Sequence, residues 1–280
     1  MELSIRMRNM IETKLADCER VYDVKVLFWF FRGSINIGIF RKNSDLDLIF
    51  VFKNTGENQV AAIHDIVGYG FDFWGWNIED AIKTIEINNN SFYQEREGFQ
   101  NIPLSNEHAR GGLTYYSGIY CWLNNSRSGS NLKEADELKK KLEGIAEKRV
   151  LISHILDGVE SGLSKLEIEN GMSACDYLYT TWRVLLAEHV YHGGMPGESE
   201  IDLLMSHYMD EKTKEVVNRL RAIYKNSLSK HAQFFSIEDI NFFISKKYNY
   251  LKTILKELEP EKEENLSEKI VDIKAFVDKL

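Results

Sequence analysis

The first 90 residues switch between helix-like and strand-like patterns of apolar positions. Apolar residues spaced three and four apart, with charges between them, predict an amphipathic helix over residues 4–20. Gly68-Tyr69-Gly70 predicts a hairpin turn, and Asn77 is placed to cap a helix that runs to about Ile87 and stops at Asn88-Asn89-Asn90. β-branched and aromatic runs predict strands over residues 24–31, 46–52, 60–67 and 71–76.

The second half of the chain has a helical pattern throughout. The polar residues 124–131 predict a linker before this helical half, and a charged break at 259–265 precedes a last short helix. These patterns predict an α+β fold, with a small mixed β-sheet and flanking helices over residues 1–123 and an all-helical domain over residues 132–280. The helices are expected over residues 135–156, 173–191, 201–206, 212–224 and 242–258.

Charge and cysteine content narrow the classes of function. The formal net charge of −8 disfavours a protein that grips long nucleic acid through many phosphates. Cys18, Cys121 and Cys175 form no C-x-x-C pair, and their odd number argues against a disulfide framework, so a cytoplasmic location is expected. No apolar run reaches the about 20 residues that span a bilayer, so no membrane partner is expected. The last amphipathic helix could pack on the body of the protein or on a second subunit, which leaves a homodimer open.

Three aspartates are the candidate chemistry of the N-terminal half. Asp45 and Asp47 are two residues apart on a predicted strand and therefore point to one face. Carboxylates this close repel each other unless a cation neutralises them, and their hard oxygens suit Mg²⁺. Asp72, isolated among apolar neighbours on another predicted strand, is the expected third metal ligand and would assist deprotonation of an acceptor. Asp65, on a neighbouring strand, is the alternative.

The Gly33-Ser34 turn is the candidate phosphate site. Glycine lets the backbone approach a phosphate closely, and backbone N–H groups at a turn into a helix attract anions. The Ser34 hydroxyl can add a hydrogen bond to the terminal phosphates.

In order and spacing, these residues resemble the DNA polymerase β-like nucleotidyltransferase superfamily. The chain is most similar to a bacterial and phage family of predicted nucleotidyltransferases, through a Gly-Ser-x-x-x-Gly motif followed by Ser-Asp-x-Asp and a later acidic residue. The matching residues are Gly33, Ser34, Gly38, Ser44, Asp45, Asp47 and Asp72. Asn77 departs from the family's usual aspartate, and the family's lysine- and tyrosine-rich helix is loosely echoed by Asp176-Tyr177-Leu178-Tyr179 and Arg183.

The resemblance implies a Mg²⁺-dependent (or Mn²⁺-dependent) enzyme that moves a nucleoside monophosphate from an NTP, such as ATP, to an acceptor hydroxyl. It implies that Asp45, Asp47 and Asp72 hold the metal and carry catalysis, and that Gly33, Ser34 and Ser44 bind the nucleotide. The acceptor is open among a small molecule, an RNA end and a protein. The alternative is a non-catalytic nucleotide-binding or regulatory module on the same scaffold.

Overall fold

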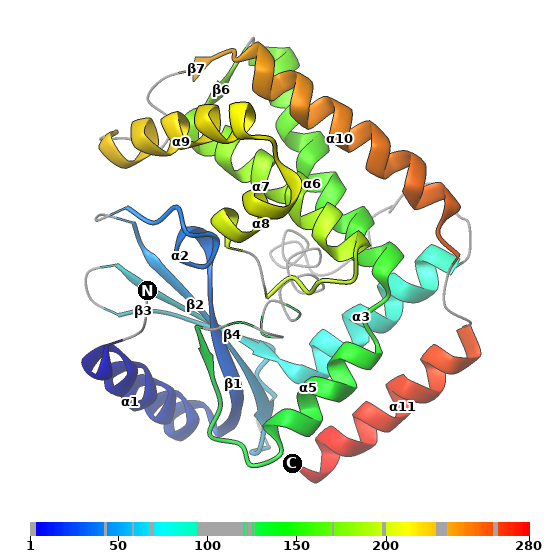
Figure 1. Ribbon diagram of the computed structural model, residues 1–280. Helices are drawn as coiled ribbons and strands as arrows, with labels where there is room; N and C mark the ends of the chain where they lie inside the picture. Colours follow the sequence, from blue (N-terminus) through cyan, green and yellow to red (C-terminus); the bar gives the residue numbers. More distant parts are fainter. Residues whose placement is uncertain are drawn as a thin grey trace. The chain divides into compact units, whose positions relative to one another are not determined.

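The computed structural model describes residues 4–41, 44–57, 59–67, 70–93, 120, 122, 125, 127–169, 171–197, 200–227, 234–259 and 263–280 (Figure 1). Cys121, Gly68-Tyr69, and parts of the predicted linker and charged break lie outside these residues. The chain forms two compact units, each of which is discontinuous in sequence. The first comprises Met1–Gly33, Asp45–Ala146 and Glu261–Leu280, and the second comprises Ser34–Ser44 and Glu147–Pro260.

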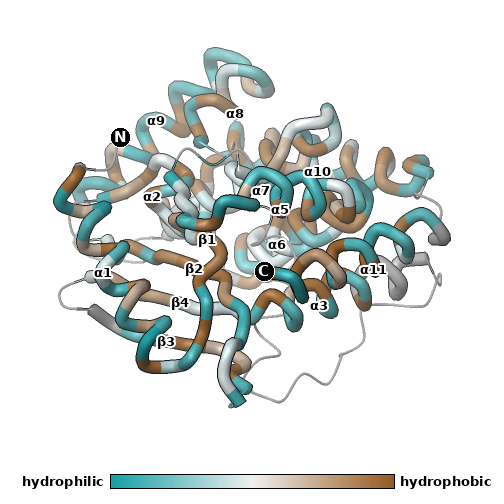
Figure 2. Tube along the Cα trace, turned by 90° about the horizontal axis from the view of Figure 1, so that it is seen from below, coloured by the Kyte–Doolittle hydropathy of each residue, from teal (hydrophilic) through white to brown (hydrophobic). Residues whose placement is uncertain are grey.

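A mixed five-stranded sheet forms the centre of the first unit, as the α+β prediction requires. The strand order is β3-β4-β2-β1-β5; β2 and β4 are parallel, and the other pairs are antiparallel. The predicted hairpin between the third and fourth strands is confirmed. Figure 2 shows mainly apolar positions along the central strands, in keeping with the buried apolar residues on both faces of β1 and β2. The strands are β1 (Val24–Arg32), β2 (Leu46–Asn54), β3 (Ala62–Val67), β4 (Phe71–Asn77) and β5 (Ser128–Gly129).

Helices cover both faces of this sheet. α1 (Ile5–Tyr22), capped by the Ser4 hydroxyl, contacts one face, where Lys14 Nζ lies 2.5 Å from Asp65 of β3. On the other face, Trp122 stacks on Phe28 of β1. Three further helices of this unit lie together in Figure 1: α3 (Ile78–Tyr93), α5 (Ala135–Gly144) and α11 (Glu263–Lys279). α11 is joined to α3 by the Lys274–Glu86 ion pair and to α5 by the Lys141–Asp272 ion pair.

The C-terminal end of α11 is bound to the sheet by two lysines. Lys25 and Lys53 are direct neighbours across β1 and β2, where two like charges would repel each other. Lys25 Nζ donates to the Leu280 carbonyl at 2.6 Å, and Lys53 Nζ donates to the Val277 carbonyl at 2.8 Å. The negative end of the helix dipole therefore offsets that repulsion. As a result, α11 and α5 group with the sheet, which differs from the predicted division into residues 1–123 and 132–280.

The second unit is helical. The predicted helix over residues 135–156 is wrong, because α5 ends at Gly144 and a separate helix begins at Lys148; Glu147 caps this helix by accepting from the Arg149 backbone N–H at 3.1 Å. None of the described helices is long and apolar enough to cross a membrane. The helices are α2 (Gly33–Ile37, whose first residue belongs to the first unit), α6 (Lys148–Glu169), α7 (Ala174–Tyr191), α8 (Ile201–Tyr208), α9 (Glu211–Asn226) and α10 (Glu238–Glu257), with a small sheet of β6 (Met172–Ser173) and β7 (Phe234–Phe235).

Close packing of α6 against α7 depends on a glycine. A Cβ at Gly162 would lie 2.9 Å from Cγ2 of Thr180 and closer still to its hydroxyl. We expect Gly162→Ala to lower the free energy of unfolding by about 1–3 kcal/mol, because the two helices must separate to admit the methyl group. Gly144→Ala is the matched control, since a Cβ there meets no described atom within 4 Å and a helical alanine is favoured by about 0.5–1 kcal/mol. Urea denaturation of both variants tests this, and a loss of equal size in the two would contradict it.

Candidate active site

Asp47 and Asp72 are brought together by the register of the sheet. β2 and β4 run parallel with Asp47 directly opposite Asp72, and residues opposite each other in adjacent strands point to the same face. Strands lie about 4.8 Å apart, so the two carboxylates are immediate neighbours. Both residues are partly exposed. Arg32, the last residue of β1, is opposite Asp47 on its other side and supplies a positive charge on the same face.

Asp45 lies just before β2 and is exposed. Its Oδ1 lies 3.8 Å from the position that a Cβ would take at Gly70, and the Leu46 backbone N–H donates to the Gly70 carbonyl at 2.6 Å. Asp45 is therefore close to Gly70, which precedes β4 and lies two residues before Asp72. Within the described part of the chain, no three or more histidine, cysteine or acidic side chains are grouped so that they could hold a metal ion. The structure thus pairs two of the three predicted carboxylates and brings the third to the same edge.

Gly33 lies directly against the Asp47 carboxylate. Its φ of +69° is in the left-handed region, and a Cβ at this position would clash with Oδ2 of Asp47. The glycine predicted from the Gly-Ser motif therefore has a second use, because it makes room for the carboxylate as well as for a sharp turn.

We expect Gly33→Ala to be more costly than its backbone conformation alone explains. Gly193→Ala is the matched control, because Gly193 has a φ of +94° but no described atom within 4 Å of a Cβ. The left-handed conformation should cost each variant about 1–2 kcal/mol of unfolding free energy, and Gly33→Ala should lose about 1–3 kcal/mol more through the contact with Asp47. Thermal or urea unfolding measures the difference; equal losses would show that Asp47 simply moves aside.

Ser34 and Ser44 belong to the second unit and are both buried. The Ser34 carbonyl accepts from the backbone N–H groups of Gly38 and Ile39 at 3.1 and 3.0 Å. The Ser44 hydroxyl accepts from the Arg41 backbone N–H at 3.2 Å and closes a turn. These contacts give both serines a local structural use, and their binding of phosphate stays a prediction.

Asp65 and Asp72 lie on opposite faces of the sheet. Asp65 is opposite Phe73 of β4, so it points to the face that carries α1, whereas Asp72 points to the face of Asp47. The hydrogen bond to Asp65 raises the pKa of Lys14, in keeping with a structural ion pair at 2.5 Å. Asp65 is therefore excluded as a partner of Asp47.

His64, which the sequence analysis did not single out, contacts Asp72. Its Nε2 lies 2.7 Å from Oδ1 of Asp72, and its ring stacks on Trp74 with centroids 3.7 Å apart and an interplanar angle of 17°. The available signal was strand alternation, because in the predicted hairpin the neighbours His64 and Asp65 must face opposite sides of the sheet.

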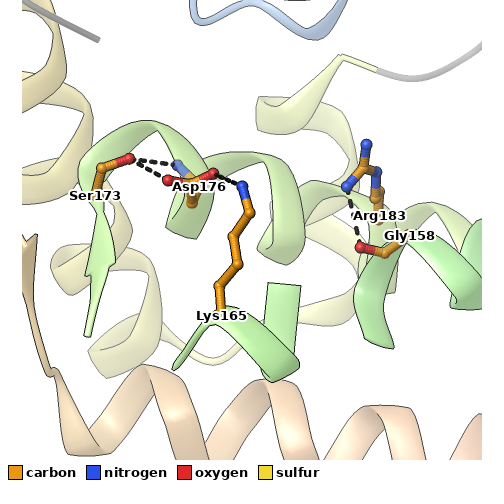
Figure 3. A network of polar contacts seen from close by, with 5 residues as sticks. All are labelled: Gly158, Lys165, Ser173, Asp176 and Arg183. Atoms are coloured by element: carbon orange, nitrogen blue, oxygen red, sulfur yellow. Dashed lines mark hydrogen bonds and ion pairs between the residues drawn. The ribbon is translucent and has the colours of Figure 1, made fainter. Parts of the chain in front are cut away.

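α7, which contains Asp176 and Arg183, is joined to α6 by polar contacts (Figure 3). Ser173 caps α7, and Asp176 accepts hydrogen bonds from the Ser173 hydroxyl at 2.5 Å and from Lys165 Nζ of α6 at 2.9 Å. Arg183 donates to the Gly158 carbonyl of α6 at 3.0 Å. Asp176 and Arg183 therefore join α6 to α7.

Comparisons with known proteins add little to this geometry. No protein-family model matches the chain, and no curated protein matches it. Among solved structures, the chain is similar to a nucleotidyltransferase-like protein from Exiguobacterium sibiricum 255-15, with 12% sequence identity, coverage of 97% of this chain and 90% of that chain, and a TM-score of 0.28. A similarity of this strength carries no argument about function.

Proposed function

We propose that the protein is a Mg²⁺-dependent nucleotidyltransferase, which moves a nucleoside monophosphate from an NTP to an acceptor hydroxyl. The observation that carries this proposal is the parallel register of β2 and β4, which sets Asp47 opposite Asp72 beside Gly33. Two aspartates side by side near the start of an otherwise apolar pair of strands repel each other, and a bound cation would offset that repulsion.

The donor set fits a magnesium ion that arrives with its nucleotide. Mg²⁺ is usually held by one or two carboxylates and completes its octahedral shell with water and phosphate oxygens. Asp47 and Asp72 would be the protein ligands, and Asp45, beside Gly70, is the candidate third; Mn²⁺ accepts the same oxygens. When bound, the ion would neutralise phosphate charge and lower the pKa of the acceptor hydroxyl.

The chain's own residues would orient and neutralise the reactants. Arg32 of β1, which is opposite Asp47 of β2, adds positive charge near the phosphates, and Gly33 lets the backbone approach them. The acceptor oxygen would form a bond to the α-phosphorus while the bond to the bridging oxygen breaks and pyrophosphate leaves. In this proposal Asp72 receives the acceptor's proton. In this proposal Ser34 and Ser44 also bind the nucleotide.

Two measurements test the proposal. Thermal unfolding with each of the four NTPs, with and without Mg²⁺, should show a rise of several degrees for at least one nucleotide only when the metal is present. Incubation of the protein with cell extract and labelled NTP should then transfer label from the α-phosphate but not from the γ-phosphate, which distinguishes nucleotidyl from phosphoryl transfer.

The outcomes separate the enzyme from its alternative. If none of the four nucleotides gives a metal-dependent rise in the unfolding temperature, the proposal is overturned. A shift without transfer of α-label to any molecule of the extract would instead support a non-catalytic nucleotide-binding module.

A further inference from the structure

The contact between His64 and Asp72 is directional. A carboxylate has only acceptor atoms, so the 2.7 Å contact requires Nε2 of His64 to carry the proton that it donates to Oδ1. This hydrogen bond leaves Oδ2 of Asp72 for another partner. The pair is on the same face of the sheet as Asp47, because the hairpin register places His64 opposite Trp74 and Ile66 opposite Asp72.

Trp74 fixes the plane of the His64 ring. The two residues are direct cross-strand neighbours, and their rings stack almost parallel. Trp74 is 40% exposed, whereas Trp76, two residues further along β4, is 4% exposed and belongs to the core. The exposed tryptophan therefore supports the histidine more than it supports the interior of the sheet.

We infer that His64 is a positioning residue, which holds the Asp72 carboxylate in place for a divalent metal and its nucleotide. This inference rests on the proposed function. Asp47 and Asp72 repel each other, so a free Asp72 side chain would turn away from its neighbour. The N–H of His64 anchors one oxygen and opposes that rotation, as outer-shell partners of metal ligands commonly do. Trp74 acts one step further out, by restricting the imidazole.

Three substitutions separate the hydrogen bond from the stacked ring. His64→Phe keeps a ring on Trp74 but has no donor, His64→Gln keeps a donor at nearly the same reach but has no ring, and His64→Ala has neither. The side chain of His64 is 42% exposed on an edge strand, so all three variants are expected to fold. Unfolding without ligand checks this directly.

The readout is the Mn²⁺ concentration that gives half of the nucleotide-dependent rise in unfolding temperature, measured with the nucleotide that stabilises the unmodified protein. We expect His64→Phe and His64→Ala to raise this concentration about 10-fold or more, and His64→Gln to restore most of the loss. In transfer assays, the same variants should raise the metal requirement more than they lower kcat at saturating Mn²⁺.

The inference is overturned if the unmodified protein responds to metal and nucleotide and His64→Phe needs the same Mn²⁺ concentration for that response. If the unmodified protein shows no metal-dependent response to any NTP, the proposed function fails and the role of His64 falls with it. The two failures are therefore distinguishable in one experiment.

Discussion

Asp47→Asn is expected to lower nucleotidyl transfer by at least about 100-fold while leaving the unfolding temperature of the ligand-free protein unchanged or higher. The activity falls because asparagine cannot neutralise a bound cation, and losses of this order follow the removal of one electrostatic group from an active site. The stability does not fall, because removal of the repulsion between Asp47 and Asp72 across β2 and β4 offsets the loss of the attraction between Asp47 and Arg32. Asp72→Asn is expected to have the same effect on transfer.

The matched control is Asp65→Asn, which removes a carboxylate from the same sheet. Asp65 points to the opposite face and pairs with Lys14, so its loss should cost stability and leave transfer intact. Release of pyrophosphate under saturating NTP measures activity, and circular dichroism on heating measures stability. Full activity in Asp47→Asn, or equal loss of activity in Asp65→Asn, would remove the proposed site.

Acidification from pH 6.5 to pH 4 is expected to cost the protein about 3 kcal/mol of unfolding free energy through His154 alone. His154 is on α6 and is 7% exposed, and burial lowers its pKa from 6.5 to about 4. Below pH 6.5 this histidine is protonated in the unfolded chain but stays neutral in the folded chain. The folded state is therefore penalised progressively as the pH falls, until both states are protonated below about pH 4.

His154→Leu should remove this dependence. Urea denaturation between pH 4 and pH 7 should give a flatter curve for the variant, with the two proteins diverging most in acid. Asp157, whose pKa is raised by burial, titrates in both proteins and cancels in the comparison. His207→Gln, at an exposed position on α8, is the control that should retain the acid sensitivity. Parallel curves for the unmodified protein and His154→Leu would contradict the prediction.

Local sequence pattern predicted most strands but not how the sheet assembles. The apolar runs of β1 and β2 and the turn before β4 are local signals, and they gave the right elements. The parallel pairing of β2 with β4 is not local, because nothing near Asp47 or Asp72 states which strands are neighbours. That pairing determines which of Asp65 and Asp72 shares a face with Asp47, and it also places His64 on that face.

Two errors in helix boundaries have different origins. α3 continues through Asn88-Asn89-Asn90 to Tyr93, although these residues were predicted to stop it. Asparagine disfavours a helix only by a few tenths of a kcal/mol per residue, and the Lys274–Glu86 ion pair from α11 helps to hold the helix in place. Conversely, Gly144 was passed over inside a predicted long helix, and it is the residue at which α5 ends.

The attachment of α11 to the sheet has a consequence for biosynthesis. A ribosome releases the strands and α5 first, then more than a hundred residues of the helical unit, and only afterwards the segment that joins α3 and α5. Until that segment emerges, Lys25 and Lys53 lack their carbonyl acceptors and α3 lacks its ion pair with Lys274. The first unit therefore obtains its last helix only after the intervening helices have been synthesised, and until then the surface that α11 covers is exposed to misassembly.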